Sequence, residues 1–326
     1  MSSIPELLKS YCGKCDFTIS AEERETARRM AMMCRQVYDD NGELPSGWSI
    51  SAREIVGLVK TDESIGFRCQ LYESNGKCVL AFAGTKCMNG SLENALQLLG
   101  QSRAYDKAVE GAKLLVDAVG ASHVTFTGHS MGGGLAAAAA LFTGAPAIAF
   151  NPAWLSSFTR EKVCKHPSVS VTNYVIFGEA LDVVQRIPQI LGTIILAVPL
   201  IDMILKNAIK PVGDVKYVYS KLLHVPQRYI DTHLLSTVLE ELQKPKSDAF
   251  NLSDLPADMF QKNITEGLEQ VAAAKIPEIL QVLSRATGSQ EGGNSAMDML
   301  FNLCSQLKSM TEAQTGRRPG VDDALD

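Results

Sequence analysis

The segment from His123 to Leu141 constrains the fold of this chain more than any other. It reads HVTFTGHSMGGGLAAAAAL, in which an apolar, β-branched run leads into the pentapeptide GHSMG and then into a stretch of small helix-forming residues. That order predicts a strand, a sharp turn and a helix, with Ser130 at the apex of the turn. In this context a G-x-S-x-G turn presents a nucleophilic hydroxyl.

The glycines of the pentapeptide have a mechanical role. We expect Ser130 to adopt a strained backbone conformation, and a Cβ atom two residues before or after it would collide with the strand or the helix. The following helix directs its N-terminus at the serine, so positive dipole and free N–H groups lie beside the reacting oxygen. The pattern therefore favours a nucleophile elbow over a structural glycine turn.

The same region resembles a known family. FTGHSMGGGLAAAAALFTGAPAIAFNPAWL, starting at Phe126, resembles the bacterial branch of the lipase class 3 family, which are serine hydrolases of the α/β-hydrolase fold. VLAFAGT at Val79–Thr85 resembles that family's strand ending in Gly-Thr. The resemblance covers about residues 20–243 and implies a mostly parallel central sheet flanked by helices. The resemblance is compatible with a phospholipase and with a lipase effector.

Composition limits the other possibilities. The chain has 326 residues, 46% hydrophobic and 21% charged, which is ordinary for a globular protein with a large core. We expect a hydrolase domain over 1–245 and a helical C-terminal region with a disordered tail over 246–326. The formal charge of −5, without a block of Lys or Arg, argues against nucleic-acid binding and against long-range attraction to an anionic membrane.

The N-terminus and the cysteines suggest a compartment. The first fifteen residues lack the apolar core of a secretory signal peptide, so we expect a cytoplasmic protein or one exported without a Sec signal. Cys12 and Cys15 form a single C-x-x-C, which is weak evidence for zinc without nearby histidines. We expect no metal and no cofactor.

Local signals predict most of the elements. Ser20 and Glu23 form a capping box before a long helix. Asn75-Gly76 predicts a hairpin that pairs Cys69 with Phe82 rather than with the second cysteine, so free thiols are expected. Further helices are expected over 101–119 and 131–143, and strands over 123–127, 147–150, 169–177 and 215–220. This alternation predicts a mostly parallel sheet covered on both faces.

A reactive serine needs a base, and in this fold the base follows it in the chain. His123 and His129 come too early, and His166 precedes the strand expected to carry the acid. His233 opens an apolar helix, a pattern that resembles the family's catalytic histidine, and His224 is the alternative base.

The acid is expected just beyond the strand at 169–177. Asp182 matches the family's Gly-x-x-x-Asp-x-Val arrangement and is preferred, with Glu179 as the close alternative. Asp182 is also compatible with a helix cap. For the oxyanion hole we expect the backbone N–H of Met131 and, by resemblance, Thr85.

Two segments have no assigned role. Residues 187–201 carry no charge, yet they are short and interrupted for a membrane span. A buried pair of helices, a mobile lid over 187–210 and a membrane anchor remain open. For the C-terminal helices, packing on the hydrolase is the default, and binding a protein partner or assisting export are alternatives.

These observations favour hydrolysis of carboxylic esters of lipids, by a lipase or phospholipase, through an acyl-enzyme intermediate. Ser130 would attack the ester, His233 would transfer the proton, and Asp182 would hold the imidazole. The expected partners are a lipid or small ester and transiently a membrane surface, with no nucleic acid. A thioesterase, amidase or acyltransferase using the same triad is an alternative, as is a catalytically idle scaffold.

Overall fold

A computed structural model describes residues 16–39, 41–85, 100–179, 181–182, 185, 210–224 and 231–244. The chain divides into two compact units, Met1–Ile264 and Thr265–Asp326, and every described residue belongs to the first. The expected boundary after residue 245, the C-terminal helices, nearly all of the insert over 187–210 and the Cys12–Cys15 pair lie outside the described residues.

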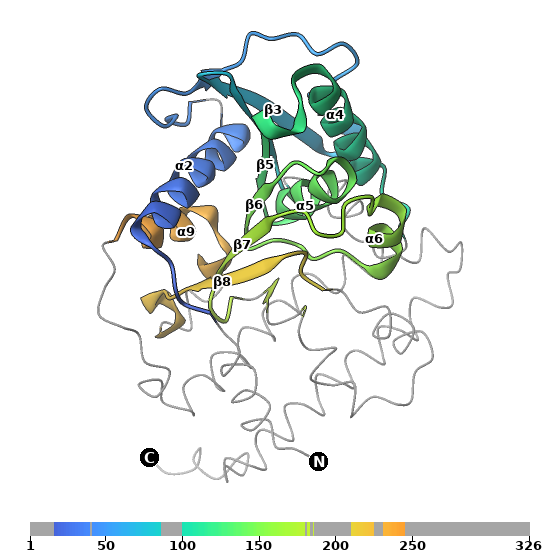
Figure 1. Cartoon of the computed structure of the whole chain (residues 1–326). Helices are drawn as coiled ribbons and strands as arrows, with labels where there is room; N and C mark the ends of the chain where they lie inside the picture. The colour runs from blue at the N-terminus through green and yellow to red at the C-terminus, as the bar shows by residue number, and fades with distance from the viewer. Residues whose placement is uncertain are drawn as a thin grey trace, which may run out of the picture. The chain divides into compact units, whose positions relative to one another are not determined.

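The described strands form one sheet. Their order is β1-β3-β4-β5-β6-β7-β8, with β2 beside β3 (Figure 1). The strands are β1 (Ser49–Ile50), β2 (Thr61–Asp62), β3 (Phe67–Ser74), β4 (Lys77–Phe82), β5 (Val124–His129), β6 (Ala147–Phe150), β7 (Val171–Ile176) and β8 (Asp214–Val218). Neighbours from β4 to β8 are parallel, whereas β1, β2 and β4 each run antiparallel to β3. The prediction of a mostly parallel sheet is therefore confirmed.

Helices cover both faces of this sheet. The described α-helices are α2 (Ala21–Tyr38), α4 (Arg103–Val119), α5 (Met131–Thr143), α6 (Ser157–Val163) and α9 (Leu235–Gln243), with short 3-10 helices η1 (Glu63–Ile65), η3 (Ala121–His123) and η4 (Lys221–His224). Helices α2 and α9 pack together on one face, and α4, α5 and α6 lie on the other (Figure 1). This arrangement confirms the expected α/β-hydrolase class of fold.

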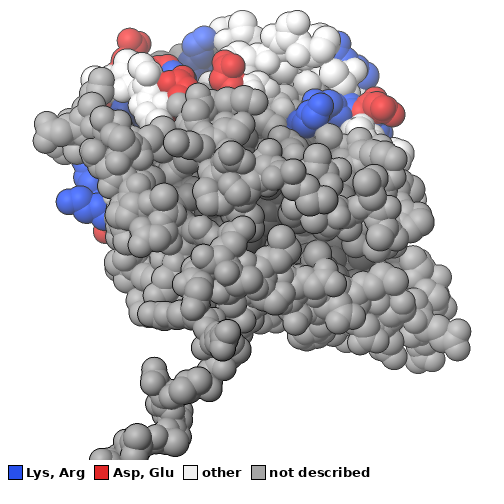
Figure 2. Space-filling model, turned by 90° about the horizontal axis from the view of Figure 1, so that it is seen from below, with Lys and Arg blue, Asp and Glu red and all other residues white. Residues whose placement is uncertain are grey.

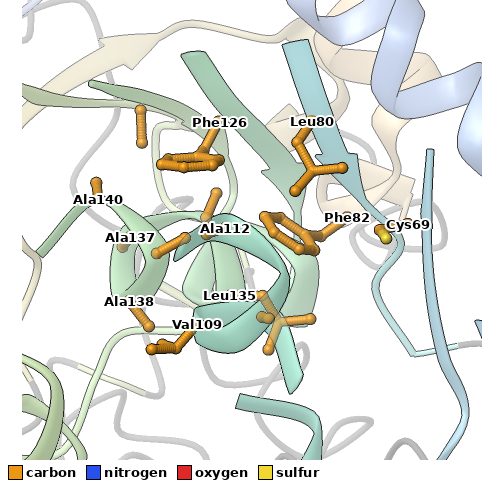
Figure 3. Packing of buried hydrophobic residues seen from close by; sticks show 14 of the residues in the cluster. Cys69, Leu80, Phe82, Val109, Ala112, Phe126, Leu135, Ala137, Ala138 and Ala140 are labelled. Atoms are coloured by element: carbon orange, nitrogen blue, oxygen red, sulfur yellow. The ribbon is translucent and has the colours of Figure 1, made fainter. Parts of the chain in front are cut away.

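Two hydrophobic clusters hold the layers together. Because successive strand residues point to opposite faces, Leu71 joins the cluster under α4 and α5 while Tyr72 joins the one under α2 and α9. Phe126 packs with residues of α4 and α5 in the first cluster (Figure 3). Full burial of such a side chain contributes about 1.5–3 kcal/mol. The alanines of α5 let this helix lie close to β5, which fixes the turn between them.

Several local predictions are confirmed. Ser20 and Glu23 exchange both bonds of a capping box at the start of α2. The hairpin of β3 and β4 pairs Cys69 with Phe82, and both hairpin cysteines are free and buried. The helix predicted over 101–119 is α4, which begins at Arg103, ends at Val119 and has Gly120 as its C-cap.

Candidate active site

Ser130 occupies the turn between β5 and α5. Its backbone has φ 57° and ψ −126°, so it lies in a region that residues other than glycine rarely adopt. Although Ser130 is the N-cap of α5, its side chain makes no capping hydrogen bond. The strained turn therefore leaves the hydroxyl available for another partner, as predicted for a nucleophile elbow.

The neighbouring glycines are required by close backbone contacts. A Cβ atom on Gly128 would lie 2.1 Å from the carbonyl oxygen of Gly132. A Cβ atom on Gly132 would lie 2.2 Å from the carbonyl oxygen of Phe82 in β4. These distances are far below any van der Waals contact, so the predicted collisions are confirmed at both positions.

His233 is the partner of the Ser130 hydroxyl. It lies on a 3-10 turn over 231–233 just before α9, and its Nε2 is 3.0 Å from Ser130 Oγ. Its Nδ1 is 2.7 Å from Glu179 Oε2. Because a carboxylate only accepts hydrogen bonds, Nδ1 is the donor, which leaves Nε2 of a neutral ring to accept from the serine hydroxyl. The side chain of His233 is 24% exposed, so the ring can meet a substrate.

The Glu179 carboxylate is fully buried and held by the backbone. Besides the imidazole, Oε2 accepts the N–H of Leu181 at 2.9 Å, and Oε1 accepts the N–H of Asp182 at 2.6 Å. Three donors converge on one side chain, which compensates for the cost of burying its charge.

This geometry corrects the preference for Asp182 as the acid, because Glu179 bonds to His233 Nδ1. Strand β7 ends at Ile176, and a turn through Gly178, which has φ 71°, brings Glu179 directly past the strand end. Glutamate also carries its carboxylate one methylene further than aspartate. Asp182 is buried, and its main chain supports the Glu179 carboxylate.

The two residues expected to form the oxyanion hole lie beside the elbow. A Cβ atom on Gly84 would be 3.2 Å from Ser130 Cβ, so the Gly84–Thr85 loop borders the serine. Thr85 Oγ1 donates to Met131 Sδ at 3.8 Å. Met131 is the first residue of α5, and its N–H belongs to the helix turn whose donors have no partner within the helix.

Two of the other histidines, His123 and His166, lie far from Ser130, and the side chain of a third, His224, is not among those described. His123 precedes β5, at the opposite end of that strand from Ser130. The N–H of His166 donates to Leu141 O near the C-terminal end of α5, far from the elbow. His224, the alternative base, ends η4, and its side chain lies outside the described residues.

Two further polar residues, His129 and Asn151, contact the main chain of His233, and the sequence did not indicate either contact. The ring Nε2 of His129 is 2.7 Å from the main-chain oxygen of His233, and Asn151 Nδ2 is 3.2 Å from the same oxygen. Burial and the nearby His233 ring lower the pKa of His129 from 6.5 to about 3. Asn151 has no local signature, because its contact with His233 spans 82 positions of the chain.

The described residues show neither a membrane span nor a metal cluster. Within the described ranges, no helix has both the length and the hydropathy of a bilayer span. The same ranges contain no group of three or more His, Cys, Asp or Glu side chains that could hold a metal ion. On the described part of the face in Figure 2, basic and acidic side chains lie close to one another.

Comparisons with known proteins give the family. Residues 29–222 match the model of a Tle-like phospholipase domain. An extracellular phospholipase A1 of Serratia liquefaciens is 34% identical over 160 residues, which are 47% of this chain and 50% of the relative. The chain thus covers about half the length of that relative.

Solved lipase structures are distant. A triacylglycerol lipase from Penicillium expansum is 14% identical with a TM-score of 0.39, covering 62% of this chain and 81% of that one. A hormone-sensitive lipase from a metagenome library is 12% identical with a TM-score of 0.29, covering 80% and 97% respectively.

The family match contains Ser130 and Glu179, while His233 lies beyond its end. Since residues 29–222 make up more than half of the chain, the protein is a lipase- and phospholipase-like α/β-hydrolase that belongs to the Tle-like phospholipase domain family.

Proposed function

We propose that the protein hydrolyses carboxylic esters of phospholipids through an acyl-enzyme intermediate. The observation that carries this proposal is the line of contacts from Glu179 through His233 to Ser130, with distances of 2.7 and 3.0 Å. Such a line is the arrangement that activates a serine hydroxyl. The choice of phospholipids rests on the family and on the name of the Serratia liquefaciens relative.

The first half of the reaction acylates the enzyme. Ser130 Oγ attacks the ester carbonyl while its proton passes to Nε2 of His233, and Glu179 stabilises the imidazolium that forms. The tetrahedral oxyanion accepts hydrogen bonds from the Met131 and Thr85 main-chain N–H groups. Each such donor is worth about 2.7–4 kcal/mol in the transition state. The imidazolium then protonates the leaving alcohol as the C–O bond breaks.

The second half releases the acid. A water molecule gives a proton to His233 and attacks the acyl group on Ser130, and the imidazolium returns that proton to Ser130 as the acyl bond breaks. The backbone bonds that fix Glu179 keep the imidazole in one orientation through both halves.

A labelling experiment tests this function. The wild type and Ser130→Ala are treated with a fluorophosphonate probe and then assayed on phospholipid vesicles, triglyceride emulsions and short oxyesters and thioesters. We expect labelling and phospholipid turnover in the wild type and neither in Ser130→Ala, with thermal unfolding as the control for folding. Labelling that persists in Ser130→Ala would overturn the serine assignment. Faster turnover of triglycerides or thioesters than of phospholipids would overturn the substrate class.

A further inference from the structure

We propose that His129 and Asn151 are positioning residues that hold the catalytic imidazole on Ser130 by binding the main-chain carbonyl of His233. This inference rests on the proposed function. His129 Nε2 is 2.7 Å and Asn151 Nδ2 is 3.2 Å from that carbonyl oxygen. Since a carbonyl only accepts, both side chains are donors, and two hydrogen bonds converge on one atom of the His233 backbone.

The carbonyls that these donors bind are not used by helix α9. The N–H groups of Thr237 and Val238 donate to Leu234 O, which lies one residue after His233. The carbonyls of Thr232 and His233 therefore precede the helix and need donors from elsewhere. Asn151 Nδ2 serves both, at 3.1 and 3.2 Å.

Asn151 directly follows β6 and is itself bound to the neighbouring strand β7. Its N–H donates to Tyr174 O at 2.9 Å, and its Oδ1 accepts the N–H of Ile176 at 2.8 Å. Ile176 ends β7, three residues before Glu179. One short side chain thus connects the strand that carries the acid with the turn that carries the base.

His129 supplies the second connection from the residue that precedes the nucleophile. It is buried at the end of β5, and its low pKa keeps the ring neutral. The bond to the His233 carbonyl requires the ring proton to be on Nε2. The Tyr38 hydroxyl lies 3.4 Å from His129 Nδ1 and 3.3 Å from His129 O, and it accepts the N–H of Gly84. His129 is therefore linked through Tyr38 to the Gly84–Thr85 loop.

Loss of these donors should act on turnover rather than on substrate binding. A displacement of about 1 Å in a catalytic group can cost on the order of 10²-fold in rate. Neither side chain donates a hydrogen bond to the imidazole, but the His129 ring also packs beside it, with ring centroids 5.1 Å apart. Asn151→Asp therefore tests the route through the His233 backbone without changing that ring contact.

The test compares apolar and donor-retaining substitutions. His129→Leu removes the donor, whereas His129→Gln places an amide Nε2 the same number of bonds from the backbone. Asn151→Asp keeps the acceptor for Ile176 and removes the donors. Thr127→Val is the matched control, because Thr127 is buried in the same strand and its hydroxyl bonds to Ile148 O, not to His233.

The readouts are kcat and KM on a short ester, the fluorophosphonate labelling rate, and thermal unfolding. We expect kcat to fall about 10–100-fold in His129→Leu and in Asn151→Asp with KM within about twofold. His129→Gln should recover most of the loss, and Thr127→Val should keep wild-type kcat.

Several outcomes would overturn the inference. If His129→Leu keeps wild-type kcat while Ser130→Ala is inactive, this inference is overturned but the proposed function is not. The inference is also overturned if Thr127→Val and His129→Leu lose kcat equally and His129→Gln restores none of the loss. Should His129→Leu fail to fold, a wild-type kcat in Asn151→Asp decides against it. Full activity of Ser130→Ala would overturn the proposed function and this inference together.

Discussion

Glu179 Oε2 lies 2.7 Å from His233 Nδ1, although these residues are 54 positions apart in the chain. The contact joins the turn after β7 to the turn before α9, and it selects one of the two carboxylates that the sequence offers near this point. Because Glu179 is fully buried and bound by two backbone N–H groups, its position is set by the fold rather than by solvent.

We predict that Glu179→Gln lowers kcat on a short ester by about 10³–10⁴-fold. The amide can donate to Nδ1, which places the ring proton on Nε2 and prevents acceptance of the serine proton; loss of such an acid by amide substitution costs about 10⁴-fold in a serine protease. Steady-state kinetics with thermal unfolding checks this.

Asp182→Asn is the comparison for that prediction. It leaves the Asp182 N–H that supports Glu179 in place, so we expect a much smaller fall in kcat. The reverse order of the two variants would reassign the acid to Asp182.

We predict that Thr85→Gly lowers kcat on a short ester on the order of 10²-fold, comparable to the loss of one oxyanion donor. The substitution removes the hydroxyl that contacts Met131 Sδ and loosens the backbone whose N–H we propose as a donor to the oxyanion. Thr85→Val, which keeps the restricted backbone, should lose less. Unchanged kcat in Thr85→Gly would remove Thr85 from the site.

Elements with strong local signals could be predicted from the sequence. The capping box of α2 needs only Ser20 and Glu23, and the hairpin register follows from the two-residue turn at Asn75-Gly76. The elbow is also marked by a short local pattern, although the contact that requires Gly132 is with Phe82 O in the distant strand β4.

The choice of acid could not be predicted in the same way. Glu179 and Asp182 are both close to the end of β7, and the path of the turn decides which carboxylate meets the imidazole. Asn151 is a harder case, because its partners at 232 and 233 adjoin it only after β6 has joined the sheet and the turn before α9 has packed beside it. No pattern within a short window of sequence indicates such a contact.

We predict that Gly128→Ala prevents folding of the elbow, whereas Gly76→Ala is tolerated. The added Cβ at Gly128 would be 2.1 Å from a backbone oxygen, which no side-chain movement can relieve. Gly76 has φ 75° and nothing within 4 Å of an added Cβ, so only the left-handed conformation is penalised, by about 1–2 kcal/mol. Urea unfolding checks both. A Gly128→Ala protein as stable as Gly76→Ala would contradict the tight packing of the turn.

We predict a pH dependence of stability that originates at His129. Burial lowers its pKa from 6.5 to about 3 in the folded protein. Between these two pH values the unfolded chain carries a proton on this ring that the folded protein does not. The stability contributed by the neutral ring is complete above the unfolded pKa and is lost as the pH falls toward 3. Between about pH 7 and about pH 5 the loss amounts to about 2 kcal/mol.

Urea unfolding of the wild type and of His129→Gln at these two pH values isolates this contribution. Glutamine does not titrate, and groups common to both proteins, such as Glu23 with its pKa lowered to about 2 by Lys216 and Ser20, cancel in the comparison. We expect the wild type to lose about 2 kcal/mol more than the variant on acidification. Equal losses would mean that His129 takes up its proton in the folded state, which would break its hydrogen-bonding pattern with Tyr38 and leave it a charged neighbour of His233.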